Sequence, residues 1–183
     1  MTVFTRRTVV GGAVAATAVG AIETPARAAD LDDFINMSAV LIGISKDKLS
    51  PFVDPINVKQ AYFDKAHEEQ PAFDPLLQIF RANPPPADAA EIILNHSGSD
   101  IRYLARSIML AWYLGAWYDP GMLQQYDSRD RPKGPIPFKV ISPAAYTQGW
   151  AWRVAQAHPM GYSDLTFGYW KDLPPPLKNF TGV

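Results

Sequence analysis

The sequence contains no cysteine among its 183 residues. This absence excludes disulfide bonds, covalent haem attachment through C-x-x-C-H, and zinc or iron–sulfur clusters held by thiolates. The three histidines, His67, His96 and His158, lie far apart in the chain. Glu68 and Glu69 follow His67, but the second histidine of a zinc-binding H-E-x-x-H helix is missing. The sequence therefore predicts no metal centre and no cofactor bound by this chain.

Patterns that carry catalysis are also scarce. Ser97-Gly98-Ser99 lacks the G-x-S-x-G spacing of a nucleophile elbow. The paired acids Asp32-Asp33 and Glu68-Glu69 are adjacent in sequence, so on a helix they point in different directions and do not face one substrate. A formal net charge of −1 at pH 7 gives no reason to expect nucleic acid as a partner. The sequence predicts no catalytic residues.

The N-terminal segment 1–28 has the three zones of an export signal. Arg6 and Arg7 precede an uncharged stretch, Val9–Ile22, and small residues at Ala26 and Ala28 fit a signal peptidase. As a helix the stretch would rise about 21 Å, which is too short for a hydrocarbon core of roughly 30 Å. We expect a twin-arginine signal, read by the twin-arginine translocase, with cleavage after Ala28 and export of the folded protein to the periplasm.

Helical periodicity dominates residues 29–120 and predicts an all-α fold, a small helical bundle. The expected helices span residues 31–43, 55–70, 75–82, 87–95 and 100–118. Asp30, Asp32 and Asp33 would lie at the electropositive start of the first helix. The helix over 100–118 has few polar positions after Ser107, so we expect both of its sides to be covered at the centre of the bundle.

After residue 120 the chain is rich in proline and aromatic residues, and four of its five tryptophans follow Gly115. The sequence predicts a long irregular C-terminal segment over 121–183, part of the single domain 29–183, that wraps along the surface. Only a strand at Phe138–Ile141 and a short helix at Trp150–Gln156 are expected within it. A long irregular segment of this kind is typical of chain that packs against a partner.

Two stretches resemble one family, the small (gamma) subunits of membrane-bound FAD-dependent sugar and sugar-alcohol dehydrogenases such as D-sorbitol dehydrogenase. Phe34–Gly43 (FINMSAVLIG) is similar to the family's F-x-x-L-S-x-x-L-T-G, and Ile108–Gly115 (IMLAWYLG) is similar to its I-L-x-x-W-Y-L-G. The resemblance covers roughly residues 34–120. The C-terminal third departs from the family pattern, since 141–146 and 168–174 only echo it.

The resemblance implies a division of labour within a membrane-associated complex. A flavin-dependent large subunit would oxidise the sugar or polyol, and a multihaem cytochrome c subunit would pass the electrons on. FAD and haem c would therefore be bound by partner subunits. The large subunit of this family has no export signal, so the small subunit would escort it through the translocase and reach the membrane only through its partners.

Aromatic side chains are the residues we expect at the partner interface, because they bury much area at low entropic cost. The predicted set is Trp112, Tyr113, Tyr146, Trp150, Trp152, Tyr169 and Trp170. Packing in the chain's own core is the alternative role for each of them.

Other functions stay open at this point. A free-standing periplasmic sugar-binding protein or enzyme could stack a sugar on the C-terminal aromatics, with Gln148, Arg153 and Asp164 as its polar contacts. A structural protein associated with lipid or cell wall is a third alternative, which the nearly neutral charge disfavours.

Overall fold

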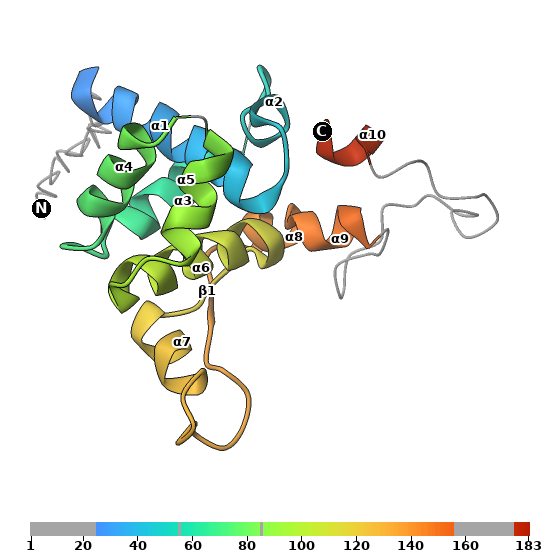
Figure 1. Ribbon diagram of the computed structural model, residues 1–183. Coiled ribbons are helices and arrows are strands. Elements are labelled where there is room, and N and C mark those ends of the chain that lie inside the picture. Colours follow the sequence, from blue (N-terminus) through green and yellow to red (C-terminus); the bar gives the residue numbers. More distant parts are fainter. Residues whose placement is uncertain (1–24, 55, 85, 156–177) are drawn as a thin grey trace, which may run out of the picture.

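Short helices dominate the protein, whose computed structural model describes residues 25–54, 56–84, 86–155 and 178–183 (Figure 1). The helices are α1 (Pro25–Ile42), α2 (Lys46–Leu49), α3 (Val58–His67), α4 (Phe73–Ala82), α5 (Pro86–Leu94), α6 (Ser99–Leu114), α7 (Pro120–Tyr126), α8 (Pro143–Thr147), α9 (Trp150–Val154) and α10 (Lys178–Thr181). The strands β1 (Ala116–Trp117) and β2 (Lys139–Val140) pair antiparallel. The predicted all-α class is confirmed.

Helix α6 lies at the centre of the bundle and contacts α1, α3, α4, α5, α7 and α9. One side is buried through Ile101, Leu104 and Ile108, and Tyr103 and Ser107 are buried as well. Both sides are therefore covered up to Ser107. Beyond it the inward side stays buried through Ile108, Ala111 and Trp112, but the residues of the other side are only partly buried, so the prediction that both sides are covered is wrong for this half of α6.

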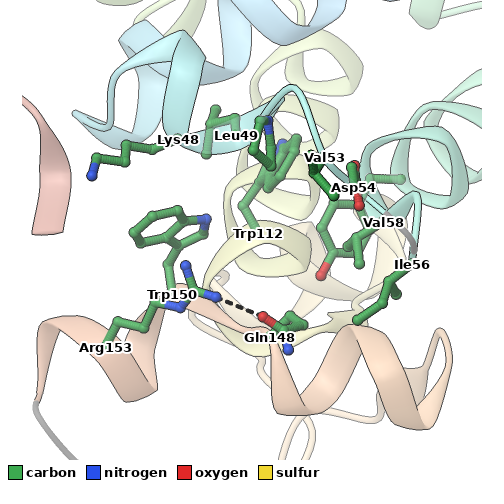
Figure 2. A pocket seen from close by; sticks show the side chains of 12 residues that line it. Lys48, Leu49, Val53, Asp54, Ile56, Val58, Trp112, Gln148, Trp150 and Arg153 are labelled. Atoms are coloured by element: carbon green, nitrogen blue, oxygen red, sulfur yellow. Dashed lines mark hydrogen bonds between the residues drawn. The ribbon is translucent and has the colours of Figure 1, made fainter.

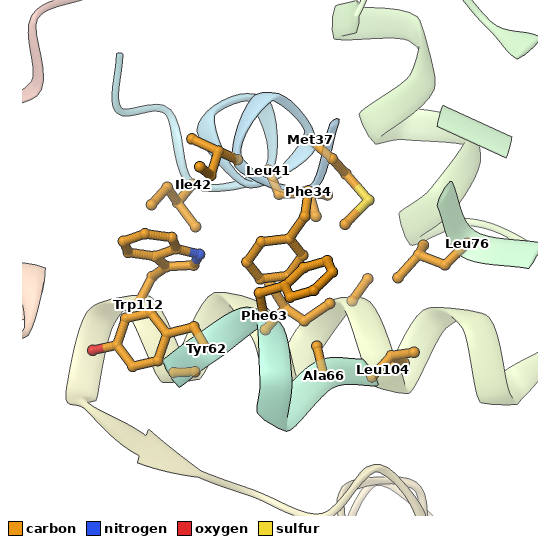
Figure 3. Close-up of a cluster of buried hydrophobic side chains, with 14 of the residues drawn as sticks. Phe34, Met37, Leu41, Ile42, Tyr62, Phe63, Ala66, Leu76, Leu104 and Trp112 are labelled. Atoms are coloured by element: carbon orange, nitrogen blue, oxygen red, sulfur yellow. The ribbon is translucent and has the colours of Figure 1, made fainter. Parts of the chain in front are cut away.

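Aromatic side chains from three helices form the inner core. Phe34 of α1, Phe63 of α3 and Phe73 of α4 are all fully buried. The Phe63 ring meets both Phe34 and Phe73 edge to face, with centroids 5.6 Å apart in each pair, an arrangement that aromatic pairs prefer. Figure 3 shows Phe34 and Phe63 lying between α1 and α6.

Helix α1 starts at Pro25, several residues before the predicted start at 31. The prediction that Asp30, Asp32 and Asp33 lie at the electropositive end of this helix is therefore wrong for the chain described. Two of these carboxylates instead bind Arg81 of α4, with Asp30 and Asp33 oxygens each 2.6 Å from its guanidinium nitrogens. All three side chains are partly exposed, so each ion pair contributes about 0–1 kcal/mol.

The central helix ends four residues earlier than predicted, at Leu114 rather than Tyr118. Gly115 follows with φ of +64°, a conformation that glycine adopts without steric cost. A Cβ at this position would lie only 2.3 Å from the carbonyl oxygen of Ala145. The backbone of α8 therefore approaches the end of α6 more closely than any side chain would permit.

Three helices of the C-terminal part, α7, α8 and α10, were not predicted. Helices α7 and α8 each begin with a proline, which resembles a helix break in the sequence but is favourable at the first helical position. The Asp119 carboxylate accepts the Met122 N–H of α7 at 2.8 Å, and the Ser142 hydroxyl accepts the Ala145 N–H of α8 at 3.0 Å. Helix α9 and strand β2 lie within the segments predicted for them. Residues 156–177 of the predicted wrap lie outside the described residues.

Substituting alanine for Gly115 tests the close approach of α8. We expect Gly115→Ala to lower the free energy of unfolding by about 3–5 kcal/mol, through the left-handed backbone and the clash with Ala145. Gly43→Ala is the matched control, since Gly43 has φ of +67° but an added Cβ would meet nothing within 4 Å. The control should cost about 1–2 kcal/mol. Urea unfolding measures both, and equal losses would refute the close approach.

Two buried serines of the core differ in their partners. The Ser38 hydroxyl has no hydrogen-bond partner among the described residues. The Ser107 hydroxyl oxygen lies 2.6 Å from the carbonyl oxygen of Tyr118 and 3.0 Å from that of Tyr103. We expect Ser107→Ala to destabilise the fold by about 1–2 kcal/mol, and Ser38→Ala to leave stability unchanged or raise it by up to about 1 kcal/mol. Thermal unfolding decides, and the opposite ranking would contradict the assignment.

Candidate functional site

A cavity of about 200 Å³ opens where the chain after α2 meets α8 and α9 at the C-terminal end of α6 (Figure 2). Its lining comes from five separate parts of the sequence. These residues are Lys48, Leu49, Pro51, Val53, Asp54, Ile56, Val58, Tyr62, Trp112, Gln148, Trp150 and Arg153.

Local hydrogen bonding holds the residues of one wall, 51–54 and 56–57. Asn57 has φ of +51°, and its backbone N–H donates to the Asp54 carboxylate at 2.8 Å. The same carboxylate lies 3.3 Å from the Lys59 ammonium in the first turn of α3, and both side chains are largely shielded from solvent. Asp54 therefore fastens the segment to α3, and its charge is balanced within the chain.

The floor of the cavity is aromatic. The Trp112 and Tyr62 rings meet edge to face with centroids 4.7 Å apart. Trp112 is only 3% exposed, and its indole N–H has no acceptor among the described residues. Burial raises the pKa of the Tyr62 hydroxyl well above its ordinary value, because the phenolate would be poorly solvated there.

Arg153 and Gln148 form the polar side, on α9 and just after α8. The Arg153 guanidinium donates to the Gln148 side-chain oxygen at 2.6 Å and lies 4.8 Å from the centre of the Trp150 ring. The sugar-binding alternative requires polar residues beside the aromatic rings, and two of its three candidates, Gln148 and Arg153, lie beside Trp150. However, Trp150 is 4% exposed and the guanidinium covers its ring, which leaves no open face for a sugar to stack on. Asp164 lies outside the described residues.

Three of the residues predicted at a partner interface serve this chain's own packing. Trp112 and Trp150 belong to the buried core. Tyr113 is half-buried, and its hydroxyl donates to the Ile42 carbonyl at the end of α1 at 2.7 Å. The buried rings of Trp112 and Trp150 therefore leave almost no surface of their own for a partner.

Tyr146 and Trp152 are half-buried beside each other. Their rings meet edge to face at 5.4 Å, and the Trp152 indole N–H donates to the Tyr146 carbonyl at 2.8 Å. Tyr169 and Trp170 lie outside the described residues. Direct contact of these four with a partner stays a prediction.

The two ends of the expected export signal are differently placed. Arg6 and Arg7 lie outside the described residues, whereas Ala26 and Ala28 lie in the first turns of α1. Between them, Arg27 forms an ion pair with Asp64 of α3 at 2.5 Å. Cleavage after Ala28 stays a prediction.

A second, larger groove of about 400 Å³ lies between α6 and α7, and its walls are mainly apolar. Its apolar residues include Met109, Leu110, Leu123 and Ile136. Asp127 sits at its edge, where hydrogen bonds from Arg106 and Tyr103, each 2.8 Å long, lower the pKa of the carboxyl group. This cluster joins α6 to the end of α7.

Two of the three histidines make contacts within the fold. The His67 ring packs against Phe63 and Phe73, with centroids 5.9 and 5.3 Å apart, and the His96 ring nitrogen accepts the Gly98 N–H at 3.0 Å. His158 lies outside the described residues. Within the described part of the chain, no three His, Asp or Glu side chains are grouped to hold a metal ion.

The sequence analysis did not identify a group of exposed apolar residues next to the cavity. Phe52 is fully exposed, Val53 is 75% exposed and Ile56 is 45% exposed. Val53 and Ile56 line the cavity, and Phe52 directly precedes Val53 in the chain. A signal existed, since these residues stand between and beside Pro51 and Pro55 with no helical or strand period that would bury them.

The raised pKa of Tyr62 predicts a loss of stability at high pH. The unfolded chain releases the phenol proton near pH 10, its ordinary pKa, while the folded chain retains it. The free energy of unfolding should therefore fall as the pH rises above about 10. In Tyr62→Phe we expect the free energy of unfolding to fall less steeply with pH. Some fall should remain, because burial also raises the pKa of Tyr118. Urea titrations across this range measure the slope, and an unchanged slope would contradict the assignment.

None of the helices in the described ranges is both long and apolar enough to cross a membrane. No curated protein and no solved structure gives a significant match to the chain. A family model matches residues 2–127, more than half of the chain, and its description is membrane-bound FAD-containing D-sorbitol dehydrogenase. The match includes both sequence motifs and the helical bundle from α1 to α7, so the chain belongs to this dehydrogenase family, as its small-subunit motifs predicted.

Proposed function

We propose that this chain is the non-catalytic small subunit of a periplasmic, membrane-associated, FAD-dependent sugar or sugar-alcohol dehydrogenase. It would bind the flavoprotein large subunit, carry it through the twin-arginine translocase and stabilise it afterwards. The family match over residues 2–127 carries the proposal, since it spans both the Arg6-Arg7 segment and the helical bundle.

The residues present do not fit FAD, which the family name includes. A dinucleotide needs a glycine-rich turn between a parallel strand and a helix, where backbone N–H groups meet the pyrophosphate. The sequence has no G-x-G-x-x-G, and in the described ranges the only sheet is the two-residue pairing of β1 with β2. We propose that the large subunit binds FAD and, as the family resemblance implies, that a cytochrome subunit binds haem c.

The two family motifs support a binding role because they are engaged with each other inside the bundle. Phe34–Gly43 forms the second half of α1, and Ile108–Gly115 forms the end of α6. The Tyr113 hydroxyl joins them through the Ile42 carbonyl. Since the motifs build the core, they preserve a scaffold, and its outer surface is left for the partner.

A partner that binds only the folded small subunit shifts the equilibrium toward the folded form. At a free partner concentration one hundred times the dissociation constant, the gain is about 2.7 kcal/mol. The benefit is mutual, so a large subunit held by this chain would also resist unfolding. In this way the small subunit would stabilise the large subunit by binding alone, without taking part in the reaction.

The export role is tested by replacing both signal arginines with lysine, Arg6→Lys with Arg7→Lys, in the host that makes the complex. We expect dye reduction driven by D-sorbitol or a related substrate to move from the membrane fraction to the cytoplasm, because the translocase reads the arginine pair as an address. Arg27→Lys is the matched control and should leave the activity at the membrane. Unchanged export in the double variant would overturn the escort role.

The non-catalytic role has a separate test in the purified chain without residues 1–28. We expect no turnover of D-sorbitol with an added electron acceptor, and no heat of binding when sugars are titrated into it. Turnover by this chain alone would overturn the proposal. Saturable sugar binding that Arg153→Gln abolishes would favour the sugar-binding alternative.

A further inference from the structure

An apolar projection and a polar cavity lie side by side at the C-terminal end of α6. The projection consists of Phe52, Val53 and Ile56, and Figure 2 shows Val53 and Ile56 at the cavity margin. Because Asp54 is bound both to Asn57 and to Lys59, the segment that presents them is held in place. A phenyl ring held fully in water is unusual, since burying it would gain about 1.5–3 kcal/mol.

The cavity has room for one side chain. Its volume of about 200 Å³ is smaller than the roughly 300–1,000 Å³ typical of small-molecule sites. Its size therefore suits a single residue inserted by another protein better than a cofactor.

The charges around the cavity favour an acidic occupant. Lys48 and Arg153 both line it, and neither is paired with a carboxylate among the described residues. The one acid in the lining, Asp54, already pairs with Lys59. Gln148 and the Trp150 ring hold the Arg153 guanidinium in one orientation, so little entropy is lost when it binds a carboxylate.

We propose that this face, formed by Phe52, Val53 and Ile56 with the adjacent cavity, is the docking surface for the flavoprotein large subunit. Phe52 enters an apolar pocket of the partner, and an Asp or Glu side chain of the partner enters the cavity between Lys48 and Arg153. An exposed aromatic anchor beside an arginine is the composition of interface hot spots. The inference rests on the proposed small-subunit function and specifies where that subunit binds.

A second copy of the chain fits this face less well. A two-fold dimer brings the same patch of both copies together, so Lys48 and Arg153 of one copy would lie against the same cations of the other. A lipid surface would bury Phe52 and Val53 but would leave the cavity unfilled. The flavoprotein therefore remains the occupant that uses both parts of the face.

Two pairs of variants in the tagged, co-expressed complex test the proposal. Phe52→Ser should weaken binding of the large subunit by about tenfold or more, as expected for a hot-spot residue. Its matched control is Phe138→Ser, because Phe138 is also exposed, at 57%, but directly precedes β2 and does not line the cavity. Arg153→Glu should weaken binding similarly, and Arg131→Glu on the chain between α7 and β2 should not.

The readouts are the flavin recovered per small subunit after washing and the dissociation rate of the complex, with thermal unfolding to confirm that each variant is folded. If the wild-type chain retains no flavoprotein, the proposed function fails. If wild type retains it and the Phe52 and Arg153 variants match their controls, the docking surface fails. The docking surface is also overturned if Phe52→Ser loses binding to phosphatidylglycerol vesicles but keeps the flavoprotein, or if it only abolishes a dimer of this chain.

Discussion

The contact between the end of α6 and the backbone of α8 is the constraint on which the candidate site depends. Gly115 ends the helix, turns the chain into β1 and leaves room for the Ala145 carbonyl where a Cβ would otherwise lie. Only because α8 lies this close do Gln148, Trp150 and Arg153 reach the Trp112 side of the bundle. A packing requirement at one backbone position thus brings the C-terminal part of the chain to the cavity.

The residues that build the scaffold of this protein and the residues that distinguish its outer surface lie in different parts of the sequence. The residues that identify the family, in the second half of α1 and at the end of α6, are mostly turned inward and join through the Tyr113 hydroxyl and the Ile42 carbonyl. The features that distinguish the outer surface, Phe52 above all, lie outside both motifs. The motifs identify the scaffold, while the proposed docking surface uses exposed residues that lie between them.

Periodicity predicted the helical class, the central place of α6 and the approximate span of most of the longer helices. A helix that buries one face has apolar residues at every third or fourth position, and this pattern is visible in the sequence. It misplaced the end of α6, since Gly115 stops the helix although apolar residues continue after it. It missed α7 and α8, where proline starts a helix instead of ending one. The cavity itself was beyond prediction, because Lys48, Tyr62 and Arg153 meet only through tertiary packing.

The early start of α1 has a consequence for maturation. Proteases bind their substrates extended, often as an added strand, whereas Ala26 and Ala28 lie here in helical turns that Arg27 ties to Asp64. A peptidase acting at this point would first have to unwind the beginning of α1 and release that ion pair. Removal of the residues up to Ala28 would then bring Asp30, Asp32 and Asp33 to the new helix start, where the helix dipole favours negative charge. Asp30 and Asp33, which bind Arg81 in the longer chain, would then lie in the first turn of the shortened helix.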